Sequence, residues 1–147
     1  MSRWVRASVI VQAFGYALDA VWHGVLHPGA EPTTVNDMLR HLGTVHLPLY
    51  VGALNLLAAT LAALVRERRR SPAGLALPIA FLGAVISVAA EGWHAYSHLR
   101  LDTHSGPIAG TLSFVGFAIV VVAMSVFARP RRRRRQRAAT AHTRRAA

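Results

Sequence analysis

Four apolar stretches dominate the sequence and limit the folds that this chain can adopt. Each is about as long as the 20 residues that an α-helix needs to cross the hydrocarbon core of a bilayer. With 53% hydrophobic and only 16% charged residues, the chain also lies outside the range of soluble domains. The stretches cover residues 7–26, 47–65, 75–98 and 107–128. We predict an all-α, polytopic membrane protein whose residues 1–128 form one four-helix bundle.

Basic residues mark the ends of the predicted spans. All 17 are arginines, and fifteen lie at Arg3, at Arg6, in residues 66–70 or beyond residue 128. Arginine is enriched in the cytoplasmic loops of membrane proteins. The N-terminus, the loop between the second and third spans and the C-terminus are therefore predicted to be cytoplasmic, so that two helical hairpins lie in an N-in, C-in orientation. The absence of lysine suggests a GC-rich bacterial genome, and hence a multi-pass protein of the bacterial cytoplasmic (inner or plasma) membrane.

The tail, residues 129–147, is rich in arginine and is predicted to be disordered and cytoplasmic. A basic run attracts any polyanion, nucleic acid included. Its position directly after a membrane span instead favours a topology anchor that binds anionic lipid headgroups. We therefore expect membrane lipids rather than nucleic acid as its partner. The sequence leaves open whether the bundle forms homo-oligomers.

One short motif occurs twice, 71 residues apart, near the outer ends of the first and third spans. The pattern Trp-His-x-x-x-His begins at Trp22 and again at Trp93. Each predicted hairpin then has a histidine shortly before a proline near the start of its return helix, at His46 and His104. This arrangement suggests an internal repeat, which would place two related sets of histidines around a shared site.

Polar residues spaced three or four positions apart form one stripe on each of these two spans. Unsatisfied polar groups in hydrocarbon cost several kcal/mol each, so both stripes are expected to face the bundle interior and each other. Carboxyl groups this deep in a span usually serve a function. The stripes are Gln12, Tyr16, Asp19, His23 and His27 on the first span, and Ser87, Glu91, His94 and His98 on the third.

Histidines are concentrated at the outer end of the predicted bundle, where seven of the eight lie and only His142 does not. Because the chain has no cysteine, any metal must be bound by nitrogen and oxygen, which favours zinc, iron, copper or nickel. We predict a site for two transition metal ions (iron, copper or zinc), with Asp19 and Glu91 also acting in catalysis. The predicted ligands are Asp19, His23, His27, His46, Glu91, His94, His98 and His104.

The long outer connection between the first two spans has the signals of a short helix. Thr33 or Thr34 can cap its start, and the helix would run through Arg40 and end near Gly43. His41 lies on this helix, and the sequence does not decide whether it only decorates the helix or joins the other outer histidines as a ligand.

Other polar or aromatic residues are given structural roles. Trp22 and Trp93 are expected in the aromatic belt at the outer membrane interface. Tyr16 and Tyr50 are expected to pack, and Asn55 to form an interhelical hydrogen bond.

The number of predicted ligands and their depth within the membrane spans favour a membrane oxidoreductase. It would have a dinuclear metal centre and act on a small or lipophilic substrate. The spacing Glu91-x-x-His94 is that of di-iron carboxylate bundles, although the first span offers Asp19-x-x-x-His23 instead. Three alternatives stay open: metal-ion binding or transport without catalysis, a bis-histidine haem in an electron-transfer protein, and a zinc-dependent membrane hydrolase.

Overall fold

The computed structural model describes residues 3–29, 32–68, 75–102 and 106–125, and all regular secondary structure in these ranges is helical. The predicted tail lies outside the described residues. The last helix of the described chain, Gly106–Ser125, is called the C-terminal span below. The preceding elements are α1 (Arg3–Val21), the π-helical turn η1 (Trp22–Leu26), α2 (Val35–Leu42), α3 (Leu47–Arg68) and α4 (Ala76–Leu99).

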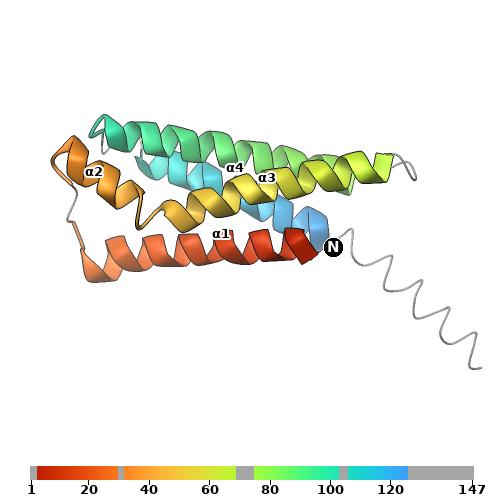
Figure 1. Ribbon diagram of the computed structural model, residues 1–147, viewed down its shortest axis with the longest axis horizontal. Helices are drawn as coiled ribbons and strands as arrows, with labels where there is room; N and C mark the ends of the chain where they lie inside the picture. The colour runs from red at the N-terminus through yellow and green to blue at the C-terminus, as the bar shows by residue number, and fades with distance from the viewer. Residues whose placement is uncertain (1–2, 30–31, 69–74, 103–105, 126–147) are drawn as a thin grey trace, which may run out of the picture.

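Four helices are long and apolar enough to cross a membrane, as predicted. They are α1 continued by η1, most of α3, all of α4 and the C-terminal span, and their ends lie within about one helical turn of the predicted ones. Figure 1 shows the four packed lengthwise in one bundle. The ends of α1 and α4 and the starts of α3 and the C-terminal span meet at one end, beside α2. We call this the histidine end, and the opposite one the N-terminal end.

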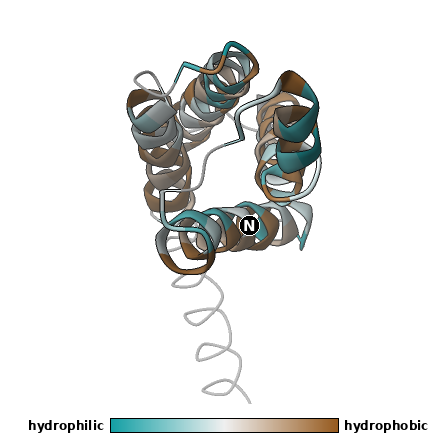
Figure 2. Cartoon of the chain, turned by 90° about the vertical axis from the view of Figure 1, so that its left-hand side faces the viewer, coloured by the Kyte–Doolittle hydropathy of each residue, from teal (hydrophilic) through white to brown (hydrophobic). Residues whose placement is uncertain are grey.

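Apolar side chains cover much of the outside of the bundle. Figure 2, a view along the bundle, shows hydrophobic residues on the outward faces of the long helices. Phe14 on α1 is 59% exposed and Val122 on the C-terminal span 63% exposed. Such an apolar surface is suited to lipid, because hydrocarbon chains cover it without the cost of contact with water. The surface therefore agrees with a membrane protein.

Two pairs of helices approach each other closely at glycines. A Cβ atom on Gly52 of α3 would lie 2.5 Å from the Cα atom of Gln12 on α1. A Cβ atom on Gly83 of α4 would lie 2.7 Å from the carbonyl oxygen of Gly116 on the C-terminal span. Small residues at helix contacts are common in membranes, where they let backbones pack directly. These contacts fix how near the polar stripes come to each other.

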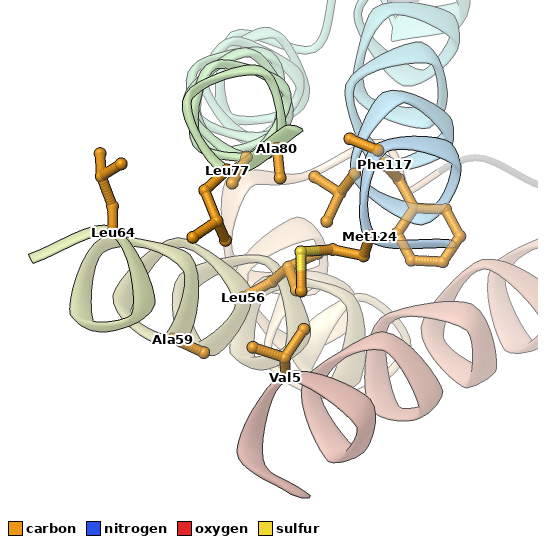
Figure 3. Close-up of a cluster of buried hydrophobic side chains, with 11 residues drawn as sticks. Val5, Leu56, Ala59, Leu64, Leu77, Ala80, Phe117 and Met124 are labelled. Carbon is orange, nitrogen blue, oxygen red and sulfur yellow. The ribbon is translucent and has the colours of Figure 1, made fainter. Parts of the chain in front are cut away.

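The N-terminal half of the interior is apolar. Figure 3 shows side chains from all four long helices meeting there, among them Val5, Leu56, Leu77 and Phe117. Val5 and Leu56 are fully buried. The hydroxyls of Ser8 and Thr60, which are also buried in this half, donate their hydrogens to carbonyl oxygens of their own helices, those of Trp4 at 3.0 Å and of Leu56 at 2.8 Å. Among the described residues, the polar groups that remain buried are therefore concentrated toward the other half of the bundle.

Candidate metal site

A buried hydrogen-bond network marks the middle of the bundle, where the polar half begins. The amide nitrogen of Gln12 on α1 donates to the Ser87 hydroxyl on α4 at 2.7 Å. The hydroxyls of Tyr16 and Ser113 lie 2.6 Å apart, and those of Ser87 and Ser113 3.2 Å apart. Gln12 and Tyr16 belong to the predicted stripe of the first span, and Ser87 to that of the third. The two stripes therefore face each other, as the sequence predicted.

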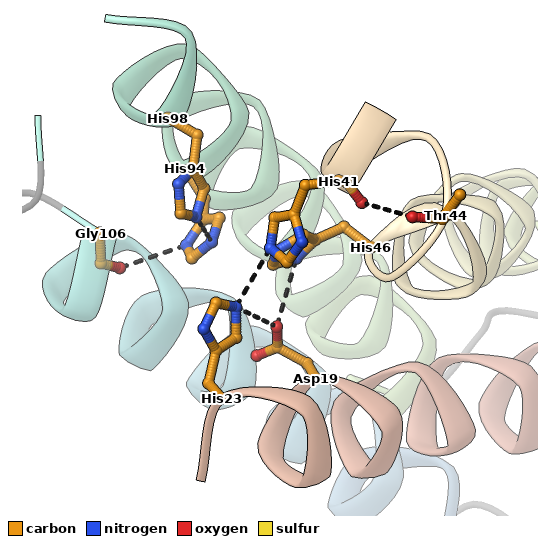
Figure 4. A network of polar contacts seen from close by, with 8 residues as sticks. All are labelled: Asp19, His23, His41, Thr44, His46, His94, His98 and Gly106. Atoms are coloured by element: carbon orange, nitrogen blue, oxygen red, sulfur yellow. Dashed lines mark hydrogen bonds and ion pairs between the residues drawn. The ribbon is translucent and has the colours of Figure 1, made fainter. Parts of the chain in front are cut away.

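Five imidazole rings lie together at the histidine end (Figure 4). Contacting rings have centroids between 4.5 Å apart, for His94 and His98, and 6.2 Å apart, for His41 and His98. They form two sets of three that share His46, and in each set one nitrogen per ring lies within 4.8 Å of the others. Each set is geometrically able to hold a metal ion. We call these five residues the histidine cluster: His23, His41, His46, His94 and His98.

The first set has the spacing of metal ligands. The Nε2 atom of His41 lies 3.2 Å from Nε2 of His23 and 3.2 Å from Nε2 of His46. A neutral imidazole nitrogen has either one hydrogen or one in-plane lone pair, so Nε2 of His41 cannot make two good hydrogen bonds at once. Nitrogens that bind zinc tetrahedrally at 2.0–2.1 Å lie about 3.3 Å apart. A cation that receives all three lone pairs therefore suits this arrangement better than hydrogen bonds do.

The second set is oriented by the backbone. His94 and His98 are one turn apart on α4, and their Nε2 atoms are 2.8 Å apart. Nδ1 of His94 lies 3.2 Å from the carbonyl oxygen of Gly106, to which it donates its hydrogen. The lone pair of His94 is then on Nε2 and faces the cluster. A second hydrogen bond of this kind commonly fixes the tautomer of metal-binding histidines.

His46 joins the two sets and is only 1% exposed. Its Nδ1 atom lies 3.4 Å from Oδ1 of Asp19, and that oxygen lies 3.6 Å from Nε2 of His23. Burial, together with repulsion from the neighbouring imidazoles of His94 and His41, lowers the pKa of His46 to about 2. His46 is therefore neutral at physiological pH, as a metal ligand must be.

Glu91 is buried, at 4% exposed, but belongs to neither set of three. It lies one helical turn before His94 on α4, closer to the middle of the bundle. The structure therefore brings Asp19 to the histidine cluster and places Glu91 beneath it, and direct metal binding by Glu91 stays a prediction.

His27 lies outside the cluster because the helix changes at η1. The N–H of His27 donates to the carbonyl oxygen of Trp22, five residues earlier, at 2.8 Å, and the backbone then leaves the helical conformation with φ −136° and ψ 58°. The His27 ring stacks on Trp22 with centroids 3.9 Å apart. The predicted shared face of His23 and His27 assumed a regular α-helix. His104, the remaining predicted ligand, lies outside the described residues.

The sequence left the role of His41 open, and the structure brings it into the histidine cluster. It is 7% exposed and is the central residue of the first set. The short helix was predicted correctly: Thr34 caps α2 by accepting from the N–H of Asp37, and Gly43 follows its end. The missed signal is the spacing of Met38 and Leu42, which are buried on the same face of α2 as His41.

Asn55 also differs from its prediction. Its side-chain nitrogen donates to the carbonyl oxygen of Val51 on its own helix at 2.8 Å, and the residue is exposed. The side chain therefore forms its hydrogen bond within its own helix, and it makes no interhelical hydrogen bond with the described residues.

A pocket of about 420 Å³ lies between η1 and α2 and adjoins the cluster at His41. His41 belongs both to the wall of this pocket and to the first set of ligands. Trp22 lines it as well, instead of serving only as an interface residue. The complete lining is Trp22, His27, Pro32, Thr33, Asp37, Arg40, His41 and Thr44.

No protein-family model, curated protein or solved structure matches the chain. The functional conclusion therefore depends on the chemistry of the site itself.

Proposed function

We propose that this protein is a membrane metalloenzyme whose histidine cluster binds two transition metal ions, iron or copper, and performs redox chemistry on a small or lipophilic substrate. The observation that carries the proposal is the position of His46 in two sets of three imidazoles, each with nitrogens within 4.8 Å. For each ion to have three protein ligands, His46 would have to lose its remaining ring hydrogen and bridge the two ions as an imidazolate, because a neutral imidazole has a single lone pair for a metal. Three protein ligands per ion would then leave room for a water or substrate, which is the usual arrangement of a catalytic site. Two neighbouring ions can hold one substrate oxygen between them.

Asp19 has a supporting role in this proposal. Its carboxylate lies beside Nδ1 of His46 and Nε2 of His23, at 3.4 Å and 3.6 Å. A carboxylate near a metal-binding imidazole orients the ring and increases its basicity, and it can also complete the coordination of an ion. In both cases its negative charge offsets the charge of the ions in a low-dielectric interior.

The pocket between η1 and α2 is the proposed substrate entrance. It is lined by the indole of Trp22 and by charged groups from Asp37 and Arg40, and it ends at His41. An aromatic wall beside polar groups is suited to a molecule with an apolar body and a polar group that reaches the metal. From the distribution of arginines we propose that this entrance lies on the extracytoplasmic side of a bacterial membrane.

Metal transport is the first alternative, and the interior argues against it. A cation that crosses the bundle would need polar groups along its full length. The N-terminal half is instead filled by apolar side chains such as Val5, Leu56 and Leu77. A bis-histidine haem is also disfavoured, because the five rings of the cluster contact each other and would have to separate for a porphyrin to enter. A zinc hydrolase would use the same ligands, so metal identity must decide that alternative.

Elemental analysis and visible and electron paramagnetic resonance spectra of protein purified without added metal test the proposal. We expect iron or copper at about two ions per chain, without the absorption of a porphyrin. Two zinc ions would favour the hydrolase or the transport protein instead. A porphyrin spectrum would support the haem alternative, and protein that binds no transition metal would contradict the proposal.

A further inference from the structure

The pocket between η1 and α2 carries one positive and one negative charge side by side. Arg40 and Asp37 both line it, and they lie three residues apart on α2, which places them at neighbouring positions of the helix surface. Both side chains are exposed. The indole of Trp22 and the imidazole of His27, stacked on each other, form an aromatic part of the wall. A ligand that matches this lining has an anionic and a cationic group close together.

The guanidinium of Arg40 is available to the anionic group of a ligand. Of the 17 arginines, only Arg40 and Arg100 lie outside the clusters at residues 3–6, 66–70 and 129–147. Arg100 is engaged, because its Nη1 atom donates to the hydroxyl oxygen of Tyr96 at 3.1 Å and its Cζ atom lies 5.8 Å from the centroid of that ring. The Arg40 guanidinium makes no hydrogen bond or ion pair with the described residues. Guanidinium binds phosphates and carboxylates through two parallel hydrogen bonds, so an anion of either kind suits this position.

The carboxylate of Asp37 is held in place by the cap of α2. The hydroxyl of Thr34 donates to the Oδ2 atom of Asp37 at 2.7 Å, and the N–H of Asp37 donates back to that hydroxyl oxygen at 3.2 Å. The other carboxylate oxygen, Oδ1, accepts no hydrogen bond from the described residues. An ammonium group is its complement, since a hydrogen bond between two charged groups is stronger than one between neutral groups. A ligand with a negative charge alone would be repelled by Asp37.

The two elements that form the pocket also expose apolar side chains. Val25 and Leu26 on η1, and Leu39 on α2 between Asp37 and Arg40, are each more than half exposed. Acyl chains of a lipid can cover such side chains while its headgroup lies among the charged ones. A water-soluble zwitterion would leave these apolar side chains in contact with water. The pocket and its surroundings therefore match an amphiphile whose polar end is zwitterionic.

We propose that this pocket binds the headgroup of a phospholipid with a primary ammonium group, as in phosphatidylethanolamine, with the phosphate at Arg40 and the ammonium at Asp37. A quaternary ammonium, as in phosphatidylcholine, has no N–H to donate to the carboxylate. The volume of about 420 Å³ is within the range of about 300–1,000 Å³ that is usual for small-molecule sites. The headgroup would lie beside His41 of the first set of ligands. That the bound lipid is also the substrate rests on the function proposed for the cluster, whereas its binding does not.

Native mass spectrometry of the full-length protein in detergent tests this inference with added dioleoyl phosphatidylethanolamine. We expect Arg40→Gln to weaken its binding about tenfold or more, because a charge-assisted contact is lost. Arg40→Lys, which keeps the charge but not the paired donors, should weaken it less. Arg100→Gln is the matched control, since it removes the other arginine outside the clusters, and it should bind the lipid like the native protein.

Dioleoyl phosphatidylglycerol, which has the phosphate without the ammonium, tests the role of Asp37. We expect Asp37→Asn to bind phosphatidylethanolamine several-fold more weakly and phosphatidylglycerol no more weakly than the native protein does. Asparagine keeps an oxygen that can accept from Thr34, so the cap of α2 is preserved. The arginine-rich tail, residues 129–147, is the same in every variant, so its attraction for anionic lipid cancels when variants are compared.

Equal binding of phosphatidylethanolamine by Arg40→Gln and Arg100→Gln would overturn the headgroup site. Unchanged binding of this lipid by Asp37→Asn would overturn a zwitterionic ligand. Displacement of the lipid by an equal concentration of water-soluble glycerophosphoethanolamine would overturn a lipid as the ligand. The metal content of the same preparations separates this inference from the proposed function. Protein with two metal ions but no lipid binding that depends on Arg40 contradicts the inference alone, whereas such binding by protein without metal contradicts only the function proposed for the cluster.

Discussion

The nitrogen atoms of the histidine cluster are the part of the molecule where single residues matter most. His41 brings a second helix segment to the site, and its Nε2 atom is 3.2 Å from two other imidazole nitrogens. His94 is held by the carbonyl oxygen of Gly106, so its lone pair is directed to His98 and the cluster. The two sets therefore depend on different residues and can be tested separately.

Single substitutions should remove one ion at a time. We expect His23→Ala to lose the ion of the first set and His98→Ala that of the second, because each leaves one set with two imidazoles. Loss of one ligand typically weakens metal binding at least as much as loss of an outer-shell partner, about 10–100-fold. Metal content after dialysis against a weak chelator measures this. His27→Ala is the control, since its ring stacks on Trp22 outside both sets. If His27→Ala loses metal as readily as His98→Ala, the assignment of the two sets is wrong.

The stability of metal-free protein should depend on pH through His46. Its pKa is about 2 in the folded chain and about 6.5 when unfolded, so the unfolded state binds a proton first as the pH falls. The stabilising contribution is therefore complete above pH 6.5 and decreases progressively as the pH falls below that value. Thermal unfolding in detergent between pH 5 and 8 measures this. His46→Gln, which cannot titrate, should lack that part of the dependence, and an unchanged dependence would argue against a buried neutral His46.

The sequence identified much of the site because charged and polar residues in an apolar span are conspicuous. Asp19, His23, His94 and His98 were predicted from a regular helical spacing, and that spacing holds on α4. It does not hold at His27, because the π-helical turn widens the helix just before it. A π turn depends on local packing, which residue spacing alone does not report.

At the scale of helices, close contacts through glycine position the polar stripes. Gly83 and Gly116 bring α4 against the C-terminal span, two turns or more from Glu91 and close to Ser87. A side chain at either position would push the two backbones apart. The geometry of the hydrogen-bond network of Gln12, Ser87 and Ser113, and that of the cluster, is therefore tied to these glycines.

Gly83→Ala should destabilise the bundle, because its Cβ would lie 2.7 Å from a backbone oxygen. Overpacking of this kind costs about 1–3 kcal/mol. The matched control is Gly92→Ala on the same helix, where a Cβ would meet nothing within 4 Å. Alanine there should be neutral or stabilise by up to about 1 kcal/mol through helix propensity. Reversible unfolding in mixed detergent compares the two, and equal effects would contradict the close contact.

The elements themselves were predictable to different degrees. Length and hydropathy defined the four spans, and Thr34 with Gly43 defined the short helix α2. The position of α2 against the bundle was not predictable, because it depends on contacts with α4, which is distant from α2 in the sequence. The role of His41 could not be predicted for this reason. Asn55 was misjudged because a side chain within a span can bond its own helix instead of a neighbouring one.

At the scale of the whole molecule, polarity is divided between the two halves of the bundle. The N-terminal half is apolar inside, and the other half contains the Gln12 network, Glu91 and the histidine cluster. A cation that crossed the bundle would have to pass the apolar half, so this division supports the proposed function over transport. The internal repeat and the N-in, C-in orientation stay predictions, since neither follows from the arrangement of the helices.

Proteoliposomes test this division. Because apolar side chains fill the interior around Leu56 and Leu77, we expect no passage of Zn²⁺ or protons above that of empty liposomes. A fluorescent indicator trapped inside the vesicles measures both. Leu56→Ala serves as a comparison, because it shortens one side chain of the apolar cluster and leaves the metal ligands in place. Rapid entry of Zn²⁺ through the native protein would instead favour the transport alternative.

The most direct test of the central claim is the metal content of His46→Ala compared with the native protein and with His27→Ala. His46 belongs to both sets of ligands, so its loss should affect both ions, unlike substitutions that reach only one set. We predict about two ions per chain in the native protein and in His27→Ala, and less than one in folded His46→Ala. Full metal content in folded His46→Ala, or none in the native protein, would contradict a metal site built around this residue.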